Sequence, residues 1–219
     1  MYKIKKEDLT ALFRAIAAEQ ELYVPVKTAG KVNFGPWSED AEVDIDTLKS
    51  VKSPKDVFFP QSENLYTCER EGRKLKVEPE ALKEQRFTVF GMRACDVQGV
   101  KVLDQVFLAD PVDSFYAARR EHGTMVAIAC HEPEESCFCK VFGIDCAEPA
   151  ADVAAWFAGE ELYWKALTEK GQTLTEILSG LLTDADTEDE KKLSEEQTAI
   201  RAIVEKLPYS HLSLEGWDG

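Results

Sequence analysis

Apolar residues in the first part of the chain recur first with a helical period and then with a strand-like one. Between residues 6 and 19 they return every three or four positions, which predicts an amphipathic helix. Strands are expected at residues 22–29 and 31–37, joined by a turn at Gly30.

The next stretch is more polar and carries several prolines. Residues 38–57 predict a loop with a short helix. Residues 58–71 and 73–80 predict two strands. Because each contains a proline, we expect both to lie at or near the edge of a sheet.

The centre of the chain contains two continuous apolar runs, residues 86–92 and 123–130, which predict buried strands. Between them, apolar positions at helical spacing predict a helix over residues 97–108, capped by Asp96, and a shorter helix over residues 113–121. Two strands joined through helices predict a βαβ-like unit with a parallel pair.

The last third begins with apolar positions that predict two strands over residues 151–166 around a turn at Gly159, although the alanines of the first also fit a helix. A helix is expected over residues 171–182. The polar stretch 184–196 is a solvated linker or a helix start, and a helix should follow to Lys206.

These elements together predict an α/β fold, with α+β as the alternative, built on a mixed sheet with flanking helices. We expect one domain over residues 1–183, followed at 184–219 by an acidic linker, a helix and a C-terminal tail. The sequence contains no internal repeat.

Four of the six cysteines fall within one 17-residue stretch, at Cys130, Cys137, Cys139 and Cys146. On a strand-like path Cys137 and Cys139 would lie on one side of the chain and Phe138 on the other. Two thiolates on one side can hold one metal centre.

Cys95 lies at a predicted strand-to-helix junction, where the helix N-terminus lowers the pKa of a thiol. Cys95 and Cys130 would both lie at the carboxyl ends of two central parallel strands, the edge at which open α/β sheets place their sites. The cysteine-rich loop 131–146 follows at that edge. Cys68 lies apart from the other cysteines, and we expect it to be a small buried residue.

The charge and hydropathy of the chain exclude some classes of function. The 41 acidic and 26 basic side chains give a net charge of −15, which opposes unaided binding to nucleic acid or anionic lipid. No window approaches ~20 uninterrupted apolar residues, so we expect no membrane span. The N-terminus lacks the apolar block of a secretory signal. We therefore expect a cytoplasmic protein with reduced thiols, in which a cysteine cluster is more typical of metal binding or catalysis than of disulfides.

Cysteine spacing alone leaves the ligand open. The chain lacks the paired knuckles of zinc sites and the regular run of bacterial ferredoxins, so an iron–sulfur cluster, zinc and no metal are three alternatives. A disulfide between Cys137 and Cys139 would be strained. The sequence contains no glycine-rich phosphate loop, dinucleotide fingerprint, Ser/His/Asp order or HExxH motif.

Several polar residues fit either a site or an ordinary role. His131 could be a metal ligand, could donate a hydrogen bond to a metal ligand, or could be an ordinary loop histidine. Arg93 and Lys140 could offset the charge of a cluster or be ordinary surface charges. Asp96 fits a helix cap better than a catalytic acid, and the Arg119-Arg120 pair predicts a solvated face.

Short motifs in residues 90–143 carry a family resemblance. They comprise Gly-x-Arg-x-Cys-Asp, Leu-Asp-x-Val-Phe-Leu, Tyr-x-x-Arg-Arg and Cys-x-x-Pro followed by Cys-Phe-Cys and Gly. On these motifs the chain resembles the iron–sulfur electron-transfer subunit of anaerobic sulfite reductase and the beta subunit of soluble sulfhydrogenases. Looser similarity extends it over roughly residues 1–182. The matching positions are Gly91, Arg93, Cys95, Asp96, Leu103, Asp104, Val106, Phe107, Leu108, Tyr116, Arg119, Arg120, Cys130, Pro133, Cys137, Phe138, Cys139 and Gly143.

The resemblance implies a [4Fe–4S] cluster on Cys95, Cys130, Cys137 and Cys139, with Cys146 as a spare or alternate ligand. It implies a non-catalytic subunit that relays electrons within a multisubunit anaerobic oxidoreductase complex. Flavin, NAD(P)H and the terminal reductase or hydrogenase site would belong to partner subunits. Family members usually continue into a ferredoxin-like domain with two further clusters, whose cysteines this sequence lacks, so we expect a single relay site. The alternatives are a zinc-binding or metal-free assembly subunit, and an enzyme that uses a Cys95 thiolate.

Overall fold

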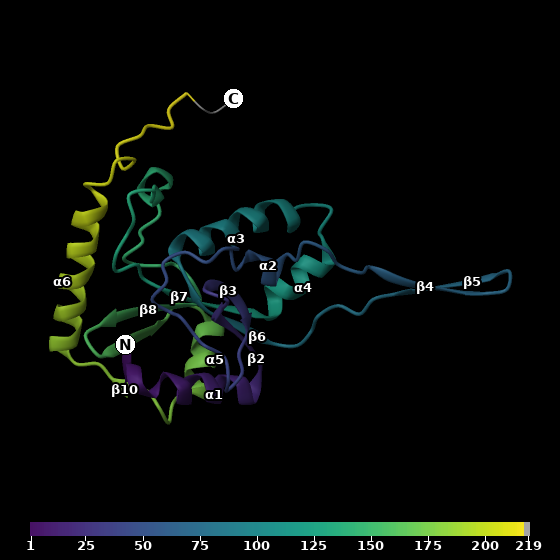
Figure 1. The fold of residues 1–219 in the computed structure, drawn as a ribbon, viewed down its shortest axis with the longest axis horizontal. Coiled ribbons are helices and arrows are strands. Elements are labelled where there is room, and N and C mark those ends of the chain that lie inside the picture. The colour runs from purple at the N-terminus through teal and green to yellow at the C-terminus, as the bar shows by residue number, and fades with distance from the viewer. Residues whose placement is uncertain (217–219) are drawn as a thin grey trace.

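The computed structural model describes residues 1–216 and places eight strands in one mixed sheet, in the order β10-β1-β9-β8-β7-β6-β2-β3 (Figure 1). The four inner strands β2, β6, β7 and β8 run parallel to one another, and the outer strands pair antiparallel. This arrangement confirms the predicted α/β class and mixed sheet. The bounds are β1 Tyr2–Lys5, β2 Glu21–Thr28, β3 Lys31–Pro36, β6 Phe87–Met92, β7 Gly123–Ile128, β8 Val153–Ala158, β9 Glu161–Ala166 and β10 Thr183–Asp184.

Helices cover both faces of the sheet. Helices α1 and α5 pack on one face, and α2, α3 and α4 lie on the other (Figure 1). Helix α6 packs along β8. Within residues 1–216, no helix has both the length and the apolar character needed to cross a membrane. The bounds are α1 Leu9–Glu19, α2 Lys55–Phe58, α3 Ala94–Phe107, α4 Ser114–His122, α5 Glu169–Ile177 and α6 Thr187–Val204.

The two central strands, β6 and β7, are buried along their whole length. Their side chains alternate between the two cores: Val126 and Ile128 pack toward α1 and α5, while Met125 and Ala127 pack toward α3 and α4. This burial on both faces explains why β6 and β7 are continuous apolar runs in the sequence and not alternating ones.

A bulge interrupts β6 at Gly91, next to the last residue of the strand and four residues before Cys95. The pairing register with β7 shifts between Phe90 and Met92, and Gly91 has a φ of +94°. A Cβ at this position would lie 3.0 Å from the Pro25 ring. Glycine is therefore required here both by the backbone conformation and by the close approach of β2.

The N-terminus of α3 differs from the sequence expectation in its capping residue. The helix begins at Ala94, so Arg93 is the N-cap, and the Asp96 side chain accepts the Arg93 backbone N–H at 3.0 Å. Asp96 thus closes a capping box from inside the first turn instead of preceding the helix. Its hydrogen bonding supports the structural role predicted for this residue over a catalytic one.

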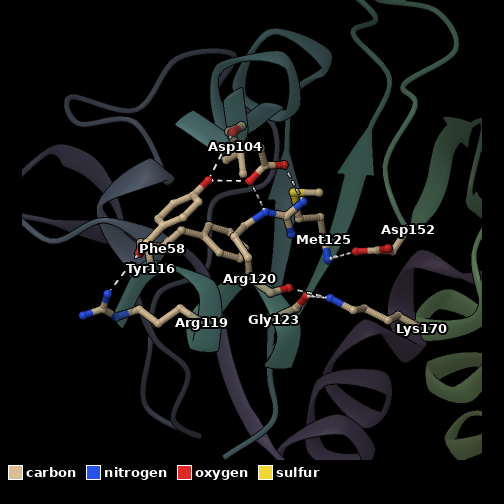
Figure 2. Close-up of polar contacts among 10 residues, drawn as sticks. Phe58, Asp104, Tyr116, Arg119, Arg120, Gly123, Met125, Asp152 and Lys170 are labelled. Carbon is tan, nitrogen blue, oxygen red and sulfur yellow. Dashed lines mark hydrogen bonds and ion pairs between the residues drawn. The ribbon is translucent and has the colours of Figure 1, made fainter. Parts of the chain in front are cut away.

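The prediction of a solvated Arg119-Arg120 pair is wrong. Arg119 is 6 % exposed, donates to the Phe58 carbonyl at 3.4 Å and forms an ion pair with Glu63. Figure 2 shows Arg120 donating twice to Asp104, at 2.7 and 2.9 Å, beside the Tyr116 hydroxyl, which donates to the same carboxylate at 2.6 Å. Two of the family-like motifs therefore form one partly buried hydrogen-bond network between α3 and α4.

The strands predicted near a sheet edge do not join the main sheet. β4 (Tyr66–Glu71) and β5 (Lys74–Pro79) pair only with each other and form a two-stranded arm that projects from the body (Figure 1). Cys68 lies on this arm and is exposed, so its predicted burial is wrong.

Candidate metal centre

The ends of β6 and β7 bring two cysteines from distant parts of the sequence to one edge of the sheet. Cys95 is the second residue of α3, three positions after β6 ends, and Cys130 follows β7 by two positions. Because β6 and β7 are parallel neighbours, their carboxyl ends meet at the same edge. Cys95 is exposed and Cys130 is buried.

Three further cysteines come from the segment between β7 and β8. Cys137 is followed by a 3₁₀ turn over Cys139–Phe142, and its C-cap Gly143 turns the chain back with a φ of +65°. Cys146 then returns to the strand end, where its carbonyl accepts the Cys130 backbone N–H at 3.0 Å. The turn at Cys139 replaces the strand-like path expected from the sequence.

The thiols contact one another in pairs. The Cys95 thiol hydrogen-bonds to Cys139, and this bond raises the pKa of Cys95 and lowers that of Cys139. Likewise, the Cys130 thiol hydrogen-bonds to Cys146, raising the pKa of Cys130 and lowering that of Cys146. Cys130, Cys139 and Cys146 lie near Cys137, whose pKa is raised chiefly by burial.

The lowered pKa that we expected for Cys95 from the helix N-terminus is therefore wrong for the free thiol. Its hydrogen bond to Cys139, the desolvation of its sulfur and the nearby Asp96 carboxylate together outweigh the helix dipole. The sequence pattern placed a helix start close to Cys95, but it could not show that a second thiol lies beside it.

Basic side chains lie against this group of thiols. The guanidinium of Arg93 donates to the carbonyls of Ile45 and Thr47 at 2.8 and 3.2 Å and of Ala129 at 3.4 Å. Its positive charge partly opposes the rise in the pKa of Cys130 that the Cys146 hydrogen bond and burial cause. Arg93 is only 4 % exposed, so it is no ordinary surface charge.

Lys49 is a second basic neighbour, which the sequence did not reveal. Its ammonium group donates hydrogen bonds to the Glu134 carboxylate at 2.6 Å and to the Ser136 hydroxyl at 2.7 Å. Its positive charge also interacts with the thiol groups of Cys95 and Cys137. No local motif marks Lys49, because it comes from a loop far away in the sequence.

Helix α6 covers one side of the same segment. Lys140 forms an ion pair with Glu205, just after α6, and Arg201 binds Asp145 at 2.7 Å. Ile200 packs against Cys130 and Cys146. This contact was not predicted, although the helix itself was.

The opposite side of the segment faces solvent. Phe138 and Phe142 are 52 % and 55 % exposed, with ring centroids 5.7 Å apart. His131 is also exposed. The phenylalanine of the Cys-Phe-Cys motif therefore lies at the surface while the cysteines on both sides are half-buried.

The side chains of residues 1–216 include no group of three or more His, Cys, Asp or Glu arranged to hold a single metal ion. The cysteines form two hydrogen-bonded pairs, Cys95 with Cys139 and Cys130 with Cys146, with Cys137 nearby.

No protein-family model matches the chain. Among curated proteins, the beta subunit of sulfhydrogenase 2 from Pyrococcus furiosus is 28 % identical over 151 residues. The chain is distantly related to that protein. The match covers 69 % of this chain and 43 % of the sulfhydrogenase subunit, so the chain spans less than half the length of the curated relative that it matches.

Proposed function

We propose that this protein is an electron-transfer subunit that holds one [4Fe–4S] cluster on Cys95, Cys130, Cys137 and Cys139. It would relay electrons within a multisubunit anaerobic oxidoreductase complex, as the resemblance to sulfhydrogenase and sulfite reductase subunits implies. The observation that carries the proposal is the meeting of thiols from three chain segments at one sheet edge. The relationship to a sulfhydrogenase beta subunit supports it.

The donor set fits an iron–sulfur cluster. Each thiolate of a four-iron cluster binds a different iron, so the sulfurs need to surround a volume and not a single ion. Two thiol pairs contributed by the ends of β6 and β7 and by the intervening loop suit that requirement. A bound cluster of this type accepts and releases one electron at a time.

The protein's own groups would hold and tune such a site. Four thiolates carry negative charge, and Arg93 and Lys49 lie where they would offset it. The backbone N–H of Asp96, in the first turn of α3, hydrogen-bonds to the Cys95 sulfur and favours its thiolate form. The exposed Phe138 and Phe142 provide an apolar contact beside the thiols for a redox partner subunit.

Single substitutions in the full chain test the ligand set. After anaerobic iron–sulfur reconstitution, the wild type should be brown, and serine at Cys95, Cys130, Cys137 or Cys139 should lose or convert the cluster. Cys68→Ser is the matched control, because Cys68 lies on the projecting arm outside the site, and it should retain full iron and sulfide. If Cys137→Ser retained its iron and Cys146→Ser lost it, the fourth ligand would be Cys146 and not Cys137. Cys146 is the alternative because it already contacts Cys130.

The same preparations separate the alternatives. One zinc per chain and no iron after reconstitution would indicate the zinc-binding assembly subunit. A colourless, metal-free protein that is alkylated rapidly at Cys95 would indicate the thiolate enzyme. Either result would overturn the proposal.

A further inference from the structure

Cys146 is a buried thiol that the proposed cluster does not use. Its side chain is 5 % exposed, and the four ligands proposed above are other cysteines. A buried cysteine is often no more than a small apolar side chain, so burial alone gives it no function. Cys146 differs from such a residue because it contacts a second thiol.

That second thiol belongs to Cys130, and main chain and side chain both join the two residues. The Cys130 backbone N–H donates to the Cys146 carbonyl at 3.0 Å, and the two side chains pack in one buried cluster with Ile200. Their thiols also hydrogen-bond to each other. Residues joined in this way lie with their Cα atoms roughly 5–6 Å apart, as in hydrogen-bonded strand pairs, and disulfides span about 4.4–6.8 Å. The backbone thus holds the pair at a separation that a disulfide can bridge.

The main chain around the pair is fixed by further contacts. On one side, the Ala147 backbone N–H donates to the Asp145 carboxylate at 2.9 Å, and the Trp156 indole N–H donates to the Ala147 carbonyl at 2.7 Å. On the other side, Cys130 continues directly from the buried strand β7. The two thiols therefore stay together in the folded chain and do not depend on a loop motion to meet.

A small oxidant can reach the pair from the Cys146 side. A cavity of about 240 Å³ lies between the cysteine-rich segment and α6, and Cys146, Ile144, Arg201 and Val204 line it. Cys130 borders a space of about 10 Å³, which holds at most one water molecule. Hydrogen peroxide is only slightly larger than water, so it fits the larger cavity and meets Cys146 first.

We propose that Cys130 and Cys146 form a reversible disulfide in the cluster-free protein, with hydrogen peroxide as the oxidant. The Cys146 sulfur attacks one peroxide oxygen and breaks the O–O bond, which gives a sulfenic acid and one water molecule. The Cys130 sulfur then attacks the Cys146 sulfur and breaks its S–O bond, which gives the disulfide and a second water molecule. The two sulfurs lose two electrons in total, and the peroxide gains them.

The disulfide and the cluster exclude each other because both use the Cys130 sulfur. This consequence rests on the proposed function, whereas the disulfide itself does not. Excess peroxide oxidises a thiol without a partner to sulfinic acid, which thiol reductants do not reverse, but a disulfide returns to two thiols. Cys146 would therefore keep the Cys130 ligand recoverable when the cluster is lost.

Peptide mapping of the full chain tests the proposal. The cluster-free protein is freed of reductant, treated with a small excess of hydrogen peroxide, alkylated, and cut with trypsin and a glutamyl endopeptidase. Cleavage after Glu135 and after Lys140 places Cys130 and Cys146 on separate peptides, apart from the other cysteines of the loop. Mass spectrometry should find these two peptides linked, and dithiothreitol should separate them.

Two variants give the comparison. Cys146→Ala removes the partner and leaves the space of its sulfur for peroxide beside Cys130, so Cys130 should form at least about tenfold more sulfinic acid than in the wild type. Cys68→Ser is the matched control, because Cys68 is exposed on the projecting arm, and it should give the same linked peptides as the wild type.

Three results would overturn the disulfide. They are alkylation of both Cys130 and Cys146 in the peroxide-treated wild type, a link from Cys146 to a different cysteine, and equal sulfinic acid at Cys130 in the wild type and in Cys146→Ala. A protein that gives the predicted link but binds no iron after reconstitution would refute the proposed cluster and leave the disulfide standing.

Discussion

Replacing Arg93 by Met tests how the cysteine edge is held together. Arg93 joins the loop at Ile45 and Thr47 to Ala129, the residue before Cys130, through three carbonyl acceptors. Methionine fills a similar volume but donates no hydrogen bond, so all three carbonyls lose their partner. An unsatisfied buried acceptor costs about 1–3 kcal/mol, and the two loop carbonyls can be partly rehydrated. We therefore expect a loss of about 3 kcal/mol in the free energy of unfolding.

Urea unfolding of the cluster-free protein in reducing buffer measures this loss without interference from the metal site. The expected loss corresponds to a fall of about 6–12 °C in Tm, since 1 kcal/mol is worth about 2–4 °C in a chain of this size. Arg93→Lys should lose about half as much, because one ammonium cannot span the acceptors that a planar guanidinium reaches. The matched control is Arg86→Met, an exposed arginine, which should change stability by less than about 0.5 kcal/mol. An equally small change in Arg93→Met would refute the reasoning.

Three further substitutions probe the fold around the site. Gly91→Ala should lose about 2 kcal/mol in urea unfolding, because alanine is strained at a φ of +94° and its Cβ meets Pro25, and an unchanged midpoint would contradict this. Asp104→Asn should lose about 1–2 kcal/mol at pH 7 after allowance for partial exposure; a double-mutant cycle with Arg120→Met should show the coupling. The hydrogen bond from Lys3, with others, lowers the pKa of Asp189 to about 2, below an unfolded value of about 3.9. Its stabilisation is therefore present above about pH 4 and lost as the pH falls toward 2, so the stability difference between wild type and Asp189→Asn should shrink over that range; a constant difference would contradict the assignment.

The two central strands and their parallel orientation could be predicted because their sequence signal is local. β6 and β7 are buried on both faces, so they are continuous apolar runs, and the helices between them fix a parallel pair. The placement of Cys95 and Cys130 at one edge follows from that topology alone. The ligand set itself stays a prediction.

The arm and the buried arginines could not be predicted because both depend on contacts between distant residues. A proline-bearing strand pattern shows that a strand avoids the sheet centre, but not that it leaves the sheet altogether. Arg119 and Arg120 look like surface residues until Glu63 and Asp104 are known to face them. The contact of α6 with the cysteine segment depends in the same way on pairs such as Arg201 with Asp145.

Iron and acid-labile sulfide analysis, combined with electron paramagnetic resonance of the dithionite-reduced protein, tests the central claim most directly. After anaerobic reconstitution we predict about four iron and four sulfide per chain, with a signal from a single reduced four-iron cluster. Cys68→Ser should give the same values, and Cys139→Ser should lose the signal. A wild-type protein that binds zinc or no metal under these conditions, with no reducible iron centre, would contradict the account.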